Sequence, residues 1–551
     1  MLCCLLVGKR NLFVRIPLRL QLGKIGSWGK SVGSYRTSVL ILLIFAVALI
    51  APVSSGAAEN AKTLFSEAVE AHWKLELDKA IQLYTRVLAL DASNAQAYFN
   101  RGVAYRSKGD ENRSFADFTQ AIAKDPGLVD ALYGRGLINL HRKVYDKALE
   151  DMDRVIELDP KHAGAYRVRG EAQIGLGNFE AALADLNEAL KLYPPDSEIY
   201  FLRAIVYQNK KNPDKALADL DQALELNPKH VGAWLKRGNL SVAEGKPKKA
   251  VEDYNRAINF DPNNAEAFNN RGWAKEELGN LDEAIADLTR ALELDPKFAL
   301  ALSNRAAVYR KMARNDAALA DYSRLLELKS SDPAIYVARG TILLDMDRGK
   351  DGIEDFDRAL EYQPQEPSIL ALRGRARVMT TRYKDAIEDL KVALEAEPDN
   401  VEVLLNRGTA YEAVKSYQNA IKDFSRAIQI DPGSATAEMY YNLGKNYLLD
   451  GDLDKAVTTL TKVIQMQPAH GLGYANRGVA YKEKGEYTRA VDDFRKARSL
   501  LKEQDRIATV SRLLNETEKR IQASPRPAPV PVIPQNSLDA ETQPSTEKRL
   551  W

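Results

Sequence analysis

The chain has 551 residues, of which 45% are apolar and 28% are charged, with 23 prolines and 32 glycines. This composition excludes collagen-like, mucin-like and wholly disordered proteins, and it supplies ample apolar material for a core. The formal net charge at pH 7 is +2, so no global positive field attracts nucleic acid. The charge is unevenly divided, because residues 1–58 hold seven Lys or Arg and no Asp or Glu, which leaves −5 for the remainder.

Residues 1–60 are expected to form a basic leader. Residues 39–51 are an unbroken apolar run of 13, whereas a bilayer-spanning helix needs about 20 residues and the core of a secretory signal about 7–15. The cations before the run would stay in the cytoplasm, which predicts export of the remainder to the periplasm or cell envelope. The leader would be cleaved as a signal peptide or kept as a transmembrane anchor, the only membrane contact expected. A leader with Arg and without acids also fits a mitochondrial presequence.

A glycine returns along most of the chain at intervals of 34 residues or twice that. With this glycine at the eighth place of a 34-residue frame, thirteen repeats fit residues 61–504, with a two-residue insertion at 435–436. Alanine takes the eighth place in the remaining repeats, as at Ala204 and Ala306. The glycines are Gly102, Gly136, Gly170, Gly238, Gly272, Gly340, Gly374, Gly408, Gly444 and Gly478.

Each frame predicts two helices. In residues 265–298, Gly279-Asn280 and Pro296 are helix stop signals, and the apolar residues between them have the i, i+3/i+4, i+7 spacing of one buried stripe. A glycine inside a helix costs ~1 kcal/mol relative to alanine, so its recurrence needs a compensating gain. A small residue, usually alanine, recurs at place twenty, and two small residues facing each other would let the paired helices approach closely.

The frame resembles the tetratricopeptide repeat family. The resemblance rests on an aromatic residue at place four, Gly at eight, Ala at twenty and Pro at thirty-two, as in Tyr98, Trp234, Phe268, Tyr474, Pro126, Pro160, Pro228 and Pro398. It implies an all-α fold, a right-handed superhelical solenoid of helix-turn-helix repeats whose first helices line a concave groove. It also implies a protein-binding scaffold without catalysis of its own.

Two segments follow the repeats. Residues 505–522 carry Ile507, Val510, Leu513, Leu514 and Ile521 and are expected to form a C-terminal helix that caps the stack. Residues 523–551 contain six prolines and no glycine, which favours an extended, disordered tail over a packed element. We expect this tail to be a spacer rather than a ligand for another domain.

Arginine occupies place seven in eleven of the thirteen repeats, and aspartate occupies place twenty-three in the same eleven. Repeats one and twelve lack both residues. A regular arginine array could bind a phosphate backbone. The joint presence and absence instead favours an Arg–carboxylate bridge, either between the two helices of one hairpin or between neighbouring repeats. Representative pairs are Arg101 with Asp117, Arg271 with Asp287, and Arg407 with Asp423.

The resemblance places frame places two, five, six, nine, twelve and thirteen on the concave side. Places five and nine of the first six repeats are mostly apolar, with Phe65, Val69, Phe99, Val103, Tyr133, Leu137, Phe201, Ile205 and Leu235. Such a strip suits an amphipathic helix or an extended apolar segment of a partner protein. The same side chains could pack along the interior of the solenoid, and the two interpretations do not exclude each other.

Place six is asparagine in several later repeats, at Asn270, Asn304, Asn406, Asn442 and Asn476. A side-chain amide offers a donor and an acceptor to a peptide backbone whatever its sequence, so these residues are a hypothetical binding ladder. Asparagine is also common at this place across the family. The carboxylate clamp of chaperone-adaptor members is disfavoured, because Leu235 stands where the lysine that accompanies Asn239 would be needed.

The sequence predicts no catalytic, metal-binding or cofactor-binding residue. Both cysteines, Cys3 and Cys4, lie in the leader, so the repeats hold no disulfide, thiolate nucleophile or thiolate metal site. His162, His230 and His470 fall at place thirty-four, at separate levels of the solenoid, and His72 and His141, which could face the groove, have no nearby ligand set. The common protease, hydrolase and phosphate-loop motifs are absent.

The predicted function is therefore a non-catalytic scaffold that binds other proteins or peptide segments in its groove, with no nucleic-acid partner. Two alternatives remain open. The chain would be the regulatory subunit of an enzyme on another chain, or an accessory protein that binds or helps to secrete an envelope polysaccharide.

Overall fold

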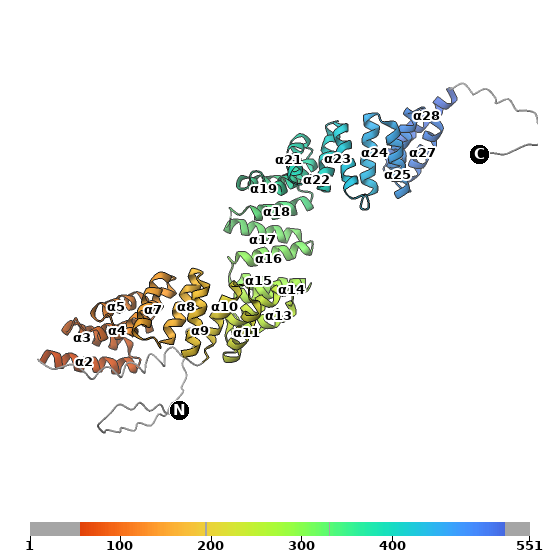
Figure 1. The fold of residues 1–551 in the computed structure, drawn as a ribbon. Helices are drawn as coiled ribbons and strands as arrows, with labels where there is room; N and C mark the ends of the chain where they lie inside the picture. Colours follow the sequence, from red (N-terminus) through yellow and green to blue (C-terminus); the bar gives the residue numbers. More distant parts are fainter. Residues whose placement is uncertain (1–55, 193–194, 330, 524–551) are drawn as a thin grey trace, which may run out of the picture. The chain divides into compact units, whose positions relative to one another are not determined.

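The computed structural model describes residues 56–192, 195–329 and 331–523, which form helices joined by short turns (Figure 1). The predicted all-α fold of tandem helix-turn-helix repeats is confirmed. Each repeat contributes one pair, whose members are called the first and second helix below. The pairs are α2 (Gly56–Trp73) with α3 (Leu77–Leu90), α4 (Ala95–Ser107) with α5 (Glu111–Lys124), α6 (Val129–His141) with α7 (Tyr145–Leu158), α8 (Ala163–Leu176) with α9 (Phe179–Leu192), α10 (Ser197–Asn209) with α11 (Pro213–Leu226), α12 (Val231–Ala243) with α13 (Pro247–Phe260), α14 (Ala265–Glu277) with α15 (Leu281–Leu294), α16 (Ala299–Lys311) with α17 (Asn315–Leu328), α18 (Pro333–Asp345) with α19 (Gly349–Tyr362), α20 (Pro367–Met379) with α21 (Tyr383–Ala396), α22 (Val401–Ala413) with α23 (Tyr417–Ile430), α24 (Ala437–Asp450) with α25 (Leu453–Met466), and α26 (Gly471–Glu483) with α27 (Tyr487–Leu500).

The chain divides into two compact units, residues 1–233 and 234–551, and the division falls within α12. In each unit the strongest contacts between alternate helices join first helices, such as α6 with α8, α14 with α16 and α20 with α22. First helices of neighbouring repeats therefore lie closer together than second helices do, so each stack curves toward its first helices. The inner side formed by the first helices is called the groove face below.

The glycine at place eight lies under the large side chain at place twenty-four of its own repeat. A Cβ added to Gly238 would lie 2.5 Å from the ring of Tyr254, and one added to Gly272 would lie 2.8 Å from Cγ of Leu288 and 3.2 Å from the carbonyl oxygen of Ala284. The closest neighbour of the glycine is thus the side chain at place twenty-four. The small residue at place twenty, which the sequence predicted as the partner of the glycine, contacts it through its backbone. Close helix packing is the gain that offsets the low helix propensity of glycine.

The turn inside each pair places one residue, at place fifteen, in the left-handed backbone region. Six of these residues are glycines, such as Gly245 with φ of +72°, and the others include Thr381 with φ of +61°. A side chain with a Cβ is strained in this conformation, and a β-branched one more so. The turn is thus imposed on several repeats by the packing of the two helices, against local preference.

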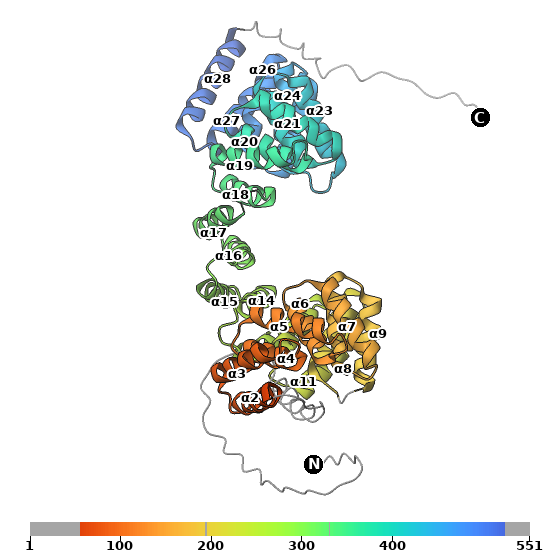
Figure 2. The ribbon, with the colours of Figure 1, turned by 90° about the vertical axis from the view of Figure 1, so that its left-hand side faces the viewer.

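The last helix, α28 (Gln504–Ala523), lies alongside α27 (Figure 2). Val510 and Leu514 are buried against the core around Phe494, while Ile521 near the end of the helix is exposed. The first helix, α2, begins five residues before the predicted frame. The apolar run 39–51 and residues 524–551 lie outside the described residues, so the signal or anchor and the extended tail stay predictions. None of the described helices is both long and apolar enough to cross a bilayer.

Candidate functional site

The arginines at place seven bind the aspartates at place twenty-three across each hairpin. Arg271 donates from Nε and Nη2 to the two carboxylate oxygens of Asp287, at 2.7 and 2.5 Å. Arg101 reaches Asp117 at 2.8 Å through both nitrogens, and Arg407 reaches Asp423 at 2.8 and 2.7 Å. The aspartates are buried and the arginine side chains are largely covered. Two parallel charge-assisted hydrogen bonds therefore fasten the two helices of one repeat.

Several of these arginines use their third nitrogen to reach the preceding repeat. Arg169 Nη1 donates to Asp153 at 2.7 Å, and Arg271 Nη1 donates to Asn255 at 2.7 Å. Thr, Ser, Asn and Asp side chains all serve as acceptors at this place, which is place twenty-five of the preceding repeat. For the pair of Arg at place seven and Asp at place twenty-three, the sequence left a bridge within one hairpin and a bridge between repeats as alternatives. The structure contains the bridge within the hairpin, and the contact between repeats goes to place twenty-five instead.

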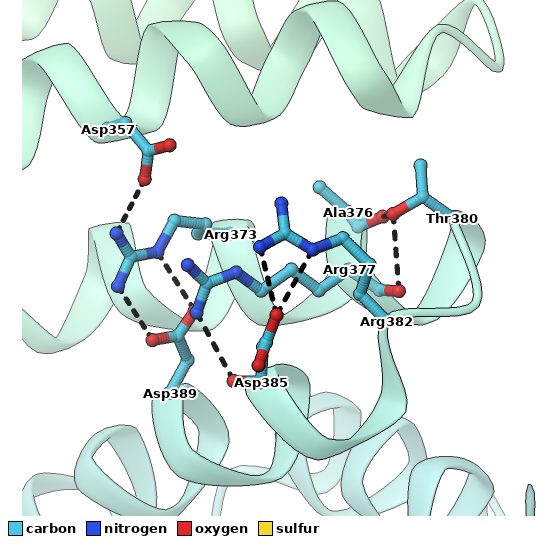
Figure 3. A network of polar contacts seen from close by, with 8 residues as sticks. All are labelled: Asp357, Arg373, Ala376, Arg377, Thr380, Arg382, Asp385 and Asp389. Atoms are coloured by element: carbon cyan, nitrogen blue, oxygen red, sulfur yellow. Dashed lines mark hydrogen bonds and ion pairs between the residues drawn. The ribbon is translucent and has the colours of Figure 1, made fainter.

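The network around Arg373 shows this arrangement closely (Figure 3). Arg373 binds Asp389 in its own hairpin and Asp357 of the preceding repeat, the latter at 2.6 Å. Arg377, one turn further along α20, also donates to Asp389, at 2.6 Å. Burial lowers the pKa of Arg377 below its ordinary value, and the positive charge of Arg373 acts in the same direction, while Asp389 opposes both. These guanidiniums hold helices together, and repeat twelve replaces the pair with buried Leu443 and half-buried Thr459.

The predicted apolar strip is used largely for internal packing. Phe99, Val103 and Leu235 are buried, and the ring of Phe99 packs on that of Phe118 with centroids 5.7 Å apart. The other members are half-buried, namely Phe65, Val69, Tyr133, Leu137, Phe201 and Ile205. The strip therefore exposes only parts of its side chains, and the three buried residues have almost no surface to offer a partner.

Three histidines at place thirty-four have a structural role that the sequence did not indicate. Nδ1 of His230 accepts a hydrogen bond from the backbone N–H of Ala233 at 3.2 Å, and its ring stacks on Phe201 with centroids 4.6 Å apart. His162 and His470 make the same pair of contacts. Each histidine thus caps the first helix of the next repeat, as Asn94, Asn264 and Asn400 do at the same place.

A chain of hydrogen-bonded asparagine amides crosses the groove face of the second unit. Asn304 donates to Asn269 at 3.0 Å, Asn269 donates to Asn270 at 2.9 Å, and Asn270 donates to Asn239 at 3.0 Å. The hydroxyl of Tyr254 also donates to Asn239, at 2.7 Å. The four amides come from α12, α14 and α16, so the chain joins three successive repeats. Asn270 and Asn304 were predicted site residues, whereas Asn269 and Asn239 were not.

The two ends of this amide chain remain available for a ligand. The middle residues, Asn269 and Asn270, are buried, while Asn239 and Asn304 are half-buried. Among the residues that the structure describes, Asn304 Oδ1 and Asn239 Nδ2 have no hydrogen-bond partner. All the amides donate in the same direction, so the chain ends in an acceptor on α16 and in a donor on α12.

Two exposed apolar side chains flank the amide chain. Trp273, which is 40% exposed, follows Asn269 and Asn270 on the same face of α14 at i+4 and i+3. Leu300, which is 54% exposed, precedes Asn304 by one turn on α16. Together with the four asparagines they form the surface that we call the amide patch.

The other predicted asparagines do not extend this chain. Asn476 donates to the hydroxyl of Tyr441 at 3.2 Å, and Asn442 is half-buried on α24. Asn406 lies on α22 at the edge of a separate cleft. The structure therefore contains one connected group of amides at place six and its neighbours, and no continuous ladder along the described first helices. No group of three or more His, Cys, Asp or Glu side chains within the described ranges is arranged to hold a metal ion.

Sequence profiles of the tetratricopeptide repeat match most of the repeat region. They cover residues 76–127, 135–230, 238–298, 337–396 and 400–504, which together are more than half of the chain. None of the curated proteins compared with the chain matches it.

Similar solved structures include a tetratricopeptide repeat protein from Parabacteroides merdae, with 21% identity, 46% of this chain and 98% of that chain covered, and a TM-score of 0.34. The Cut9–Hcn1 hetero-tetramer structure has 14% identity, covers 84% and 97%, and has a TM-score of 0.36. The protein TTC0263 from Thermus thermophilus has 25% identity, covers 33% and 98%, and has a TM-score of 0.29. From its matched profiles and its tandem helix pairs, the chain belongs to the tetratricopeptide repeat family.

Proposed function

We propose that this protein is a non-catalytic scaffold that binds an extended segment of a partner protein at the amide patch of its second unit. The observation that carries this proposal is the amide chain that ends in an unpaired acceptor on Asn304 and an unpaired donor on Asn239. An extended backbone has one N–H donor and one C=O acceptor per residue, so it can satisfy both ends. Membership of a family of protein-interaction repeats supports the kind of partner.

Trp273 and Leu300 supply the apolar part of the same surface. An apolar side chain of the bound segment would cover them, and burying apolar area contributes about 25 cal/mol per Å². The amides would then fix the position of the backbone, while the apolar contacts supply much of the affinity. This division predicts tolerance of different sequences, provided that the segment is extended and carries an apolar residue.

Selection from a library of displayed decapeptides against the full chain tests the proposal. Selected peptides should bind Trp273→Ala and Asn304→Ala at least ten-fold more weakly, and N-methylation of the peptide backbone should also weaken binding. The control is Glu293→Gln, on the exposed side of the second helix α15, which should bind as the unchanged protein does. Binding at the amide patch would be refuted if the affinity is unaffected by Trp273→Ala, by Asn304→Ala and by N-methylation of the peptide, or if the selection yields no binder.

The site of action is proposed to be the cell envelope. The basis is the basic leader with its apolar run at residues 39–51, which suits a secretory signal or anchor. Fusion of a reporter enzyme that is active only outside the cytoplasm, after residue 523, checks this location. An inactive reporter with an intact fusion protein would favour the mitochondrial or another intracellular alternative.

A further inference from the structure

A cleft of about 300 Å³ opens on the groove face between α20 and α22, in repeats ten and eleven, two repeats beyond the amide patch. We propose that this cleft selects a basic side chain, lysine or arginine, on a segment bound in the groove. The inference rests on the proposed function, because it names the chemistry of a second contact made by a groove-bound partner. The argument uses the floor of the cleft, the charges on its rim and one ion pair that spans it.

The floor of the cleft is apolar and suits an aliphatic stem. Ala393 and Val403 are buried there, and Ala371 and Leu372 are half-buried beside them. Lysine and arginine lay their methylene groups along apolar surface while the charged end remains in a polar setting. An acidic side chain has a shorter stem, so it would leave much of this floor uncovered.

The rim carries two carboxylates and one guanidinium. Glu397 and Glu402 contribute the negative charges and Arg375 the positive one, so the charged lining has a net negative charge. Glu397 is held in place by Asn400, whose Nδ2 donates to Oε2 at 2.8 Å. An incoming cation would therefore gain from the field of the rim, and an incoming carboxylate would be repelled by it.

The chain's own Arg375 already shows how a guanidinium docks on this rim. Its Nη1 lies 3.3 Å from Oε1 of Glu402, across the cleft between two neighbouring repeats. The side chains are 37% and 68% exposed, so the pair is well solvated and weak. A basic side chain from a partner can take the place of Arg375, whose long side chain then turns into solvent.

Asn406 offers a contact for the backbone of the same segment. It lies on the rim at place six, and among the described residues its side-chain amide has no hydrogen-bond partner. Once a partner's cation has displaced Arg375 from Glu402, neither Arg373 nor Arg377 is available to pair with Glu402, because both are bound to Asp389. The basic side chain would thus lie on the floor, its charged end at Glu402, with its backbone at Asn406.

Fluorescence anisotropy with four labelled decapeptides tests the inference on the full chain. The peptides share the frame Gly-Ser-Ala-Leu-X-Ala-Leu-Ser-Gly-Ser, and X is Lys, Arg, Ala or Glu. The Lys and Arg peptides should bind at least five-fold tighter than the Ala and Glu peptides. Glu402→Gln should remove this preference, whereas Arg375→Ala should strengthen binding of the basic peptides several-fold, because it releases Glu402. The control Glu388→Gln, exposed on α21, should leave all four affinities unchanged.

Weaker binding of the basic peptides to Arg375→Ala would show that Arg375 does not compete with them for Glu402, and tighter binding of the Glu peptide than of the Lys peptide would show that the cleft selects acidic segments. Either result would overturn the inference. Equal binding of all four peptides would overturn it as well. Failure of all four peptides to bind would also overturn the inference. The proposed function is tested separately, by the binding of the library-selected peptides to Trp273→Ala and Asn304→Ala. If the selected peptides depend on Trp273 while the four decapeptides bind equally, the inference fails and the proposed function stands.

Discussion

Arg271 binds both carboxylate oxygens of Asp287, which faces it from the other helix of the same hairpin, at 2.7 and 2.5 Å. Because this pair is largely buried, Arg271→Leu should destabilise the second unit by ~3–5 kcal/mol, since it leaves a buried carboxylate without its partner. Adding Asp287→Leu should recover much of the loss, as repeat twelve already carries Leu443 and Thr459 at these places. Denaturant unfolding of the two single variants and the double variant checks this, and additive losses would contradict the pairing.

His230 caps α12 through Nδ1, so its replacement by alanine should cost ~1 kcal/mol of stability. His230→Asn is the matched control, because Asn94, Asn264 and Asn400 make the same cap hydrogen bond in other repeats. The asparagine variant should keep most of the stability lost by the alanine variant. Thermal unfolding of both separates the cap from the stacking of the ring on Phe201. Equal losses in the two variants would assign the whole effect to stacking.

Thr381 has a positive φ of +61° in the turn between α20 and α21, which is strained for a β-branched residue. Thr381→Gly should therefore stabilise the second unit, by ~1 kcal/mol, although glycine raises the entropy of the unfolded chain. The denaturant midpoint should rise without a change in slope. Gly245→Ala, at the same place in another repeat with φ of +72°, should give the opposite sign. A loss of stability on Thr381→Gly would show that its side chain stabilises the turn.

His72 is buried on α2 against the ring of Tyr84, and burial lowers its pKa below the ordinary value. Between the folded-state pKa and the unfolded value of about 6.5, the unfolded chain binds more protons, so stability falls as the pH drops through about 6.5. Hydrogen exchange of α2 and α3, corrected for intrinsic rates, should show more opening at pH 5 than at pH 7. His72→Leu should reduce this difference, and an unchanged difference would exclude His72 as its source.

The sequence period was sufficient to predict the fold, because a glycine that recurs at a fixed distance has to serve the same packing in every repeat. The joint occurrence of Arg271 with Asp287, and of their counterparts, likewise indicated a contact. The third bond that several of these arginines make could not be predicted, since its acceptor varies among Thr, Ser, Asn and Asp. Several polar types satisfy one donor equally well, so they leave no pattern.

The binding surface was harder to predict than the fold. Places five and nine of the first repeats look alike in sequence, yet Phe99 is buried and Phe65 is half-buried, a difference that the repeat pattern itself does not contain. The amide patch depends on Asn269 and Asn239, which occur at their places in single repeats and carry no periodic signal. The N-terminal caps made by the histidines could have been predicted from the sequence, since His230 occupies the same place as Asn264 one repeat later.

The bonds that the arginines make to the preceding repeat also bear on how strongly the unfolding of one repeat is coupled to that of the next. Arg407 follows a repeat with Lys391 at place twenty-five, and repeat twelve has Leu443 instead of an arginine, so two successive junctions of the described second unit lack this bond. In a linear array the coupling between neighbours sets how far an opening spreads. Each of these junctions has another ion pair instead, Arg375 with Glu402 at 3.3 Å and Lys445 with Glu412 at 2.7 Å. We therefore expect the C-terminal hairpins to stay coupled to α20 and α21 and to unfold together with them.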